Sequence, residues 1–118
     1  MLDEFIAYQK TVTLWDLCWD DAELLSKDFR GKEVARQLVR SVGSISANIE
    51  EGYGRGNNKE YPQFLKIARG SAQESLGWYK KSKFLLNENI ILERTGLING
   101  IIAMLTSTIN TIENRRAK

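Results

Sequence analysis

The chain has 118 residues, with 17 Lys and Arg against 15 Asp and Glu, one Cys, one Pro and no His. Its length suits one domain, and a composition of 42% hydrophobic and 27% charged residues excludes a disordered tail, a collagen-like repeat or a mainly membrane-embedded chain. The absence of His excludes imidazole catalysis, Ser/His and Cys/His nucleophile pairs and zinc sites that need imidazole. We expect a cytoplasmic protein without a membrane partner, because residues 1–10 form no apolar leader and no apolar run reaches the ~18 residues that span a bilayer.

The charge is unevenly distributed along the chain. Residues 1–30 carry a formal charge of −4, residues 31–60 of +1 and residues 61–118 of +5, within a total of +2. The total is too small to indicate a nucleic-acid binder by itself. The gradient predicts an acidic and a basic region, unless the charges are simply dispersed over solvent faces.

The first periodic segment covers residues 3–25. Its apolar side chains recur at spacings of three and four, which predicts an amphipathic helix. We expect the buried face to contain Phe5, Tyr8, Val12, Trp15, Trp19 and Ala22. Trp15 and Trp19 are therefore interpreted as core residues, and the single Cys18, which cannot form an internal disulfide, as a small buried hydrophobe.

A short connection at residues 26–31 precedes a second predicted helix at residues 32–51. Its apolar stripe consists of Leu38, Val42, Ile45 and Ile49. Gly52 is expected to end this helix in a left-handed conformation. Residues 52–58 contain three Gly and two Asn, which predicts a loop.

The third predicted helix follows this loop and continues to about residue 87. Asn57 or Asn58 is expected to cap it, and Pro62 falls in its first turn, where a missing N–H leaves no intrahelical bond unmade. A fourth helix is predicted at residues 92–115. The apolar positions of these two helices are Phe64, Leu65, Ala68, Ala72, Tyr79 and Leu86, then Ile98, Ile101, Leu105, Ile109 and Ile112. The chain is thus predicted to be all-α, a single up-down-up-down four-helix bundle over residues 1–118.

The second helix also carries a polar stripe beside its apolar one. Its members are Gln37, Ser41, Ser44, Asn48 and Glu51. They are expected to let a neighbouring helix approach or to hydrogen-bond to it, because a buried unpaired polar group would cost about 1–3 kcal/mol. The alternative is a ligand or RNA contact through Asn48 and Glu51.

Small residues mark the third helix. Ala68, Ser71, Ala72 and Ser75 favour close backbone packing. Gly70 and Gly77, seven residues apart, each lower helix stability by about 1 kcal/mol relative to Ala. We therefore expect their face to meet another helix, either in this chain or in a second subunit.

Several cations lie near this region. They are Arg36, Arg40, Arg55, Lys59, Lys66, Arg69, Lys80 and Lys81. Such a set can neutralise phosphates, with Tyr53 as a stacking group, or it can form an ordinary solvated face. The glycines at residues 52–56 match neither a dinucleotide-binding nor a P-loop motif. Glu50, Glu51 and Glu74 cannot form a di-iron site without His, so we expect no catalytic residue, metal or cofactor.

Residues 40–55 read R-S-V-G-S-I-S-A-N-I-E-E-G-Y-G-R, and residues 64–71 read F-L-K-I-A-R-G-S, followed by Glu74. Together they resemble the signature of bacterial four-helix-bundle proteins encoded by intervening sequences in 23S rRNA genes. The resemblance implies a cytoplasmic homo-oligomeric ring, a pentamer, and an association with structured RNA or another nucleic acid. A similar accessory protein of diversity-generating retroelements works with a reverse transcriptase and nucleic acid through a basic surface.

Three hypotheses of function follow. The first is a non-enzymatic nucleic-acid-associated module. Its predicted backbone contacts are Arg40, Arg55, Lys59, Lys66 and Arg69, and its predicted structural motif residues are Ser41, Ser44, Asn48, Glu51, Gly52, Gly70, Ser71 and Glu74. The second is an adaptor ring that binds a protein partner. Enzymatic action is the third, and the sequence favours it least.

Overall fold

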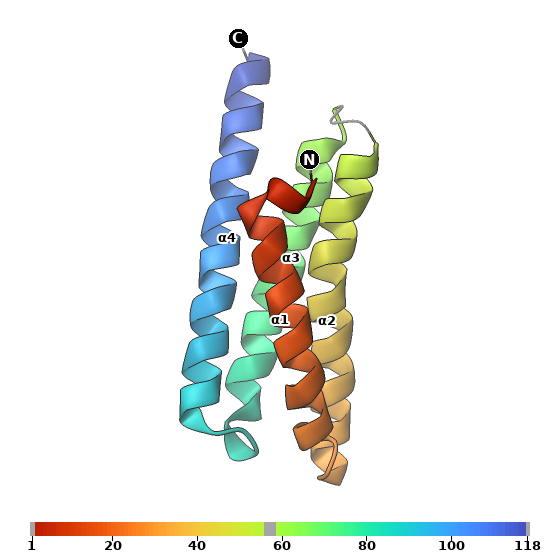
Figure 1. Ribbon diagram of the computed structural model, residues 1–118, viewed down its shortest axis with the longest axis vertical. Helices are drawn as coiled ribbons and strands as arrows, with labels where there is room; N and C mark the ends of the chain where they lie inside the picture. The colour runs from red at the N-terminus through yellow and green to blue at the C-terminus, as the bar shows by residue number, and fades with distance from the viewer. Residues whose placement is uncertain (1, 56–58, 118) are drawn as a thin grey trace.

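The computed structural model describes residues 2–55 and 59–117, and every regular element in them is helical. A short 3-10 turn, η1 (Leu2–Glu4), precedes α1 (Ile6–Leu25), α2 (Phe29–Gly54) and α3 (Tyr61–Lys81). A second 3-10 turn, η2 (Ser82–Phe84), then leads to α4 (Glu88–Ala117). Consecutive helices run in opposite directions along a molecule of 52 × 22 × 21 Å, and α4 extends beyond the others at its C-terminal end (Figure 1). The prediction of an all-α chain with four long helices is confirmed.

The turn between α1 and α2 is shorter than predicted, because α2 begins at Phe29 rather than at residue 32. Asp28 is the N-cap residue, and its carboxylate accepts hydrogen bonds from the backbone N–H groups of Arg30 at 2.8 Å and Gly31 at 3.3 Å. Gly31 is buried against the end of α1, where a Cβ atom would lie 2.0 Å from the carbonyl oxygen of Leu25. The tight α1–α2 turn therefore needs glycine at this position.

Gly52 does not end α2 as predicted. The helix continues to Gly54, and Gly52 lies buried inside it, where a Cβ atom would come within 2.8 Å of Phe64 Cβ and 2.9 Å of Tyr61 Cδ1. Glycine is needed here because α3 approaches closely, and not because the backbone is left-handed.

The boundaries of α3 and α4 also differ from the prediction. Pro62 lies in the first turn of α3, as predicted, whereas Asn57 and Asn58 lie outside the described residues and Glu60 occupies the N-cap position. The chain leaves α3 at Lys81 rather than near residue 87. Asn87 instead opens α4, because its side-chain oxygen accepts a hydrogen bond from the backbone N–H of Asn89 at 2.7 Å.

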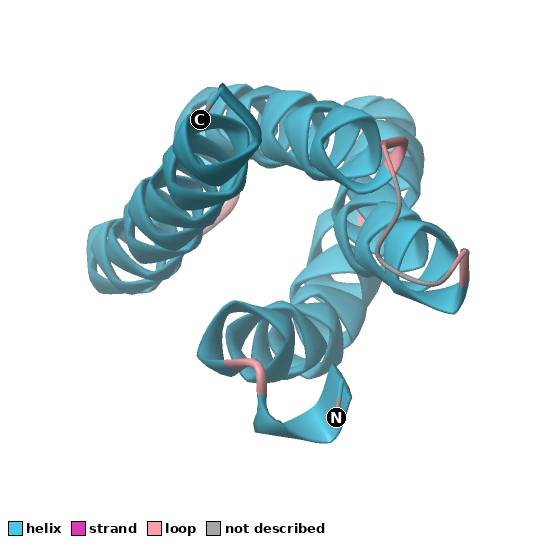
Figure 2. Cartoon of the chain, turned by 90° about the horizontal axis from the view of Figure 1, so that it is seen from above, coloured by secondary structure: helices cyan, strands magenta, loops and turns pink. Residues whose placement is uncertain are grey.

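Figure 2, which looks along the bundle, shows the four helices arranged around a common axis. Helix α1 packs against both α2 and α4. The predicted apolar stripe of α2 is fully buried, as are most predicted core positions of α3 and α4. The buried members are Leu38, Val42, Ile45, Ile49, Leu65, Ala68, Ala72, Tyr79, Leu86, Ile98, Ile101, Leu105 and Ile109. These predictions are confirmed.

The buried face predicted for α1 is right only in part. Ala22 is buried, and Phe5, Tyr8 and Trp15 are partly buried against the core. The side chains that enter the core are Ala7, Thr11, Leu14, Cys18, Asp21, Ala22 and Leu25. Two predicted core residues lie on the surface instead, Val12 with 41% and Trp19 with 62% of its area exposed. The pattern of apolar residues does not reveal the core stripe, because this stripe includes the polar residues Thr11 and Asp21. The Thr11 hydroxyl donates to the Tyr8 carbonyl at 2.7 Å, and Asp21 has a buried cationic partner.

The fourth helix is apolar around much of its circumference. Residues Glu88–Arg116 are long and apolar enough to cross a membrane by length and composition, with a mean hydropathy of 1.3 in an 18-residue window of which 22% is buried. The expectation that no stretch has this length and composition is thus wrong for α4. A single such helix is weak evidence for a membrane span, because core helices of bundles have the same composition.

Candidate nucleic-acid interface

The polar residues of the sequence motif join α2 to α3. The Ser75 hydroxyl donates to Ser41 Oγ at 2.9 Å, and the Ser71 hydroxyl donates to Ser44 Oγ at 2.9 Å. Asn48 donates to the Ser44 carbonyl at 2.8 Å and to its hydroxyl at 3.0 Å. Small hydroxyl side chains thus let the two helices approach while every hydroxyl in the contact keeps a partner.

Two of the predicted cations lie between α2 and α3 and have carboxylate partners. Arg40 forms an ion pair with Glu74, which also accepts a hydrogen bond from the indole N–H of Trp78 at 3.2 Å. Arg55 contacts Glu51 at 3.0 Å and Glu60 at 2.9 Å. The hydrogen bond to Glu51 is the main cause that raises the pKa of the Arg55 guanidinium. Its guanidinium also lies 5.1 Å from the centre of the Phe64 ring.

Two further predicted cations join α3 to α4. Lys66 forms an ion pair with Glu113 at 2.8 Å, and Arg69 donates to the Thr106 hydroxyl at 3.2 Å. Lys59, the fifth, is exposed just before α3 and lines a shallow groove of about 290 Å³ with Pro62, Gln63, Glu113 and Arg116. Three of the five predicted backbone contacts, Arg40, Arg55 and Lys66, therefore have part of their charge compensated by nearby carboxylates.

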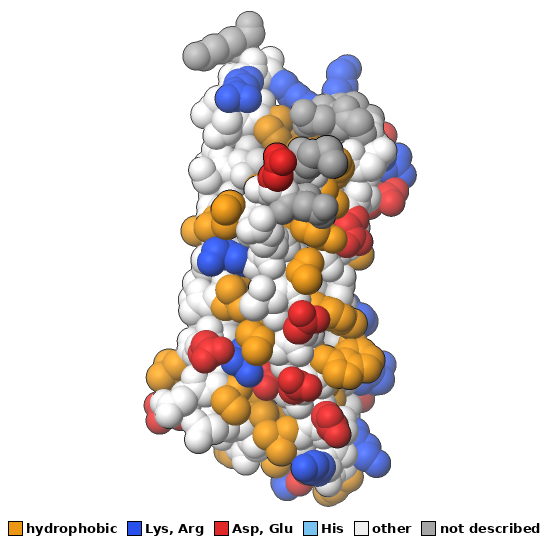
Figure 3. All heavy atoms as spheres, viewed as in Figure 1, with side chains coloured by type: hydrophobic (Ala, Val, Ile, Leu, Met, Phe, Trp, Pro, Cys, Tyr) orange, Lys and Arg blue, Asp and Glu red, His pale blue; other side chains and the backbone are white. Residues whose placement is uncertain are grey.

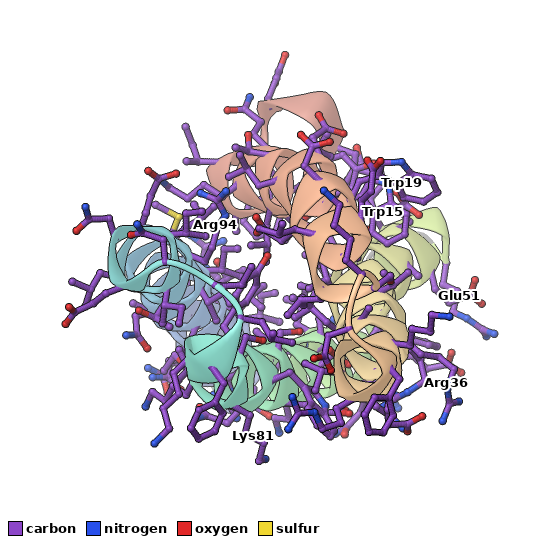
Figure 4. The ribbon with its side chains drawn as sticks, turned by 90° about the horizontal axis from the view of Figure 1, so that it is seen from below. Trp15, Trp19, Arg36, Glu51, Lys81 and Arg94 are labelled. Atoms are coloured by element: carbon purple, nitrogen blue, oxygen red, sulfur yellow. The ribbon has the colours of Figure 1, made fainter. Side chains whose placement is uncertain are left out.

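The glycines of α3 face outward. A Cβ atom at Gly70 would meet nothing within 4 Å, and one at Gly77 would meet only the flexible end of Lys81 at 3.9 Å. Among the described residues, no helix packs on these two glycines, so a contact with a second subunit is the part of the expectation that stays untested. Lys66 and Arg69 lie in the middle of α3, and Lys80 and Lys81 lie at its C-terminal end. Figure 4 shows Lys81 pointing away from the bundle.

The structure also contains a charged cluster that the sequence did not predict. The Asp21 carboxylate accepts hydrogen bonds from Arg94 Nε at 2.8 Å, from Arg94 Nη2 at 3.2 Å and from the Tyr79 hydroxyl at 2.7 Å. All three side chains are buried, and Figure 4 shows Arg94 between α4 and α1. The signals available were the acid Asp21 inside the core stripe of α1 and the cation Arg94 among the apolar residues of α4. They lie 73 residues apart, so their pairing could not be predicted from spacing.

This cluster surrounds Cys18 and makes it a poor nucleophile. Burial, followed by the nearby charge of Asp21, raises the pKa of the Cys18 thiol to about 12. Burial and the hydrogen bond to Asp21 likewise raise the pKa of Tyr79. Within the described ranges 2–55 and 59–117, no three Cys, Asp or Glu side chains are placed to hold a metal ion.

The family assignment follows from the sequence comparison. The sequence profile described as "23S rRNA-intervening sequence protein" matches residues 3–107, which is most of the chain. The chain belongs to this family. This confirms the family that residues 40–74 led us to expect.

Structural comparison agrees with this assignment. A crystal structure of a protein of unknown function from the S23 ribosomal protein family of Bacteroides thetaiotaomicron superposes with a TM-score of 0.79. The two sequences are 20% identical, and the match covers 87% of this chain and 97% of the other. At that identity the likeness shows the fold alone. No curated protein sequence matches this member of the 23S rRNA-intervening sequence protein family.

Proposed function

We propose that the chain is a non-enzymatic, RNA-associated module that works as a homo-oligomeric ring. The family's description refers to an intervening sequence of 23S rRNA, which supports RNA as the class of partner. The observation that carries the proposal is the composition of α3, which has four cations and one acid, Glu74, already paired with Arg40. Its two open glycines let a polynucleotide backbone approach the helix closely.

The proposed RNA surface is the outward side of α3 with its flanking cations. Lys66 and Arg69 lie on the α4 side of it, Arg40 on the α2 side, and Lys59 and Arg55 near its N-terminal end. The ion pairs with glutamates hold these long side chains in position. They would be exchanged for phosphate contacts on binding, with release of counterions.

Charge reversal tests this surface. Lys66→Glu with Arg69→Glu should weaken binding of a fluorescein-labelled RNA hairpin across sequences and reduce the salt slope by about 2. Lys10→Glu, on α1, is the matched control and should leave both quantities unchanged. Glu113→Gln should strengthen binding, because it removes the carboxylate that competes for Lys66. Equal affinities for all four proteins would reject the proposed surface.

Two outer faces support assembly into a ring. On the α1–α2 side, Trp19 lies over a groove of about 540 Å³ whose other walls include Ala35, Arg36 and Val39. The Trp15 ring lies beside the Trp19 ring, with ring centres 5.9 Å apart. Figure 4 shows both indoles on the outer side of α1 and α2. An exposed aromatic groove of this kind is typical of a protein contact.

The second face lies along α4 and is uncharged. Its exposed positions follow one helical stripe and are Leu92, Gly96, Asn99, Ala103, Ser107 and Asn110. The aromatic face of one subunit fits the face of small residues on the next subunit, whereas neither face fits a second copy of itself. Contact between them is heterologous, and heterologous contacts close into rings. The pentamer is the size that the resemblance implies.

Light scattering tests the ring. The wild-type protein should have about five times the subunit mass of 13.5 kDa, and Ala103→Glu should lower it by placing a charge on the α4 stripe. Gly70→Leu with Gly77→Leu should weaken RNA binding and leave the mass unchanged. A fall in mass for this double variant would place the subunit contact on α3 instead. A wild-type mass of 13.5 kDa would reject the ring.

The adaptor alternative makes a different prediction. If the groove at Trp19 binds another protein, a stoichiometric partner should co-purify, survive nuclease treatment and be lost on Trp19→Ser. A partner lost on nuclease treatment would favour the RNA module.

A further inference from the structure

The fold gathers cations at one end of the bundle, which we call the turn end. It consists of residues 24–34, around the α1–α2 turn, and residues 80–88, around η2. Because consecutive helices are antiparallel, α1 and α3 both finish there (Figure 1). Residues 24–34 and 80–88 together contain six cations and three acids, a net charge of +3 against +2 for the whole chain. Figure 3 shows Lys and Arg at this lower end, below the acidic side chains that lie over α1.

These cations are largely uncompensated, unlike those beside α3. Five of the six are lysines, namely Lys27, Lys32, Lys80, Lys81 and Lys83. Among the described residues, none of them forms an ion pair. The sixth, Arg30, is paired with Asp28, the capping residue of α2. The lysines of the turn end therefore keep their positive charge, whereas carboxylates partly compensate the charge of Arg40, Arg55 and Lys66.

Two phenylalanine rings stand in solvent among these cations. Phe29 is 80% exposed and Phe84 is 84% exposed, so neither contributes much to the core. Arg30 lies 5.5 Å from the centre of the Phe29 ring, and Lys83 lies 5.2 Å from the centre of the Phe84 ring. An apolar ring left in water gives up the free energy that its burial would contribute. The fold does not explain these two side chains.

A groove of about 290 Å³ lies between the two turns, beside the Phe84 ring. Arg30 and Val34 line its α2 side, while Lys81, Phe84 and Leu85 line the other. Arg30 therefore lies against the Phe29 ring and also lines the groove. Its walls offer apolar surface flanked by a cation on each side.

We propose that the turn end binds unpaired nucleotides of RNA, with bases stacked on Phe29 and Phe84 and phosphates held by Arg30, Lys81 and Lys83. This inference rests on the proposed function for RNA as the partner. It adds a second contact, for single strands, at the C-terminal end of α3, where it adjoins the α3 surface at Lys80 and Lys81. Proteins that bind single strands combine stacking rings with backbone cations in this way.

The alternation of ring and cation favours a nucleotide over a lipid surface. Each ring has a cation directly against it, as a polynucleotide alternates a planar base with an anionic phosphate. A surface that enters a bilayer instead keeps its cations at the rim of a continuous apolar area. The charged Asp28 next to Phe29 also opposes insertion into an anionic membrane. In a cyclic ring every copy of the turn end would lie on the same rim, which would strengthen binding through multivalency.

Fluorescence anisotropy with labelled oligouridylate and with a blunt RNA hairpin tests the proposal. Phe29→Ser with Phe84→Ser should lower affinity for the single strand at least tenfold and leave hairpin affinity unchanged. Ile6→Ser, which replaces an exposed apolar residue at the other end of the bundle, is the control. Circular dichroism should show the same helix content in all proteins. Lys83→Gln provides an independent test, since it should weaken binding of the single strand and reduce its salt slope by about 1.

The outcomes separate this inference from the proposed function. If the hairpin binds but the phenylalanine variant binds oligouridylate as tightly as wild type, the turn-end site is rejected and the RNA module stands. If neither RNA binds, both are rejected. If the variant loses binding to vesicles of phosphatidylcholine and phosphatidylserine while keeping its affinity for oligouridylate, the turn end is a lipid surface and the inference is overturned.

Discussion

Asp21 on α1 and Arg94 on α4 form a buried ion pair, with Arg94 Nε 2.8 Å from Asp21 Oδ2. Their side chains keep only 5% and 10% of their area exposed, and Tyr79 on α3 supplies a third hydrogen bond to the carboxylate. One cluster therefore links three of the four helices. Because α1 packs on α4 less extensively than on α2, this pair fixes the position of α1 against the last helix.

Removing one partner of this pair should be costly. Arg94→Met leaves the Asp21 carboxylate buried with only the Tyr79 hydroxyl, and we expect a loss of about 3–5 kcal/mol in the free energy of unfolding. Urea unfolding monitored by circular dichroism measures it. The double variant Asp21→Leu, Arg94→Met should recover part of the loss, since no buried charge is left unpaired. A loss below about 1 kcal/mol for Arg94→Met would show that water reaches the carboxylate.

The Cys18 thiol should be unreactive in the folded protein. Its pKa of about 12 keeps the thiolate population small at pH 8, and burial blocks access. Labelling by a thiol reagent should be slow in buffer and fast in urea. The raised pKa also makes stability fall as the pH rises from about 9 towards 12, because the unfolded chain releases the thiol proton first. Cys18→Ala should lessen that alkaline loss, and rapid labelling in buffer would contradict the burial.

The Asp28 cap of α2 should make stability depend on acid pH. Hydrogen bonds from the Arg30 side chain and then from its backbone N–H lower the pKa of Asp28 to about 2 from an ordinary value of 3.8. Its contribution is therefore complete above about pH 4 and is lost as the pH falls towards 2. Asp28→Asn keeps a capping oxygen without a titrating proton, so its acid unfolding curve should be flatter over this range. Parallel curves for the two proteins would contradict the assignment.

Gly52 and Gly54 provide a matched pair for the α2–α3 contact. Gly52→Ala forces a methyl group against Phe64 and Tyr61 and should cost about 1–3 kcal/mol. At Gly54 a Cβ atom meets nothing within 4 Å, so Gly54→Ala should be neutral or stabilise by up to about 1 kcal/mol. Thermal unfolding compares them directly. Equal effects would mean that α3 can shift away from Gly52.

The fold could be predicted where one helix face is clearly apolar. Leu38, Val42, Ile45 and Ile49 form such a face on α2, and their burial was predicted correctly. On α1 the prediction was right only in part, because apolar residues occupy two faces and the core stripe includes Asp21. The exposed Trp19 belongs to one of the two faces proposed for subunit contact.

The candidate site could be predicted only in part. The sequence gives the cations of α3, but not that Lys66 meets Glu113, which lies 47 residues further along the chain. Phe29 and Phe84 are also far apart in the sequence. The antiparallel packing of the helices brings them to the same end of the bundle. Charge type is local information, whereas charge compensation and clustering depend on tertiary contacts.

The most direct test of RNA association is a salt series with the wild-type protein. Anisotropy of a labelled RNA hairpin should give an affinity whose logarithm falls linearly with the logarithm of the salt concentration, because bound phosphates release counterions. Each backbone contact should add about 0.9 to the magnitude of that slope on a duplex. Binding that is absent at low salt, or that does not change with salt, would contradict the account.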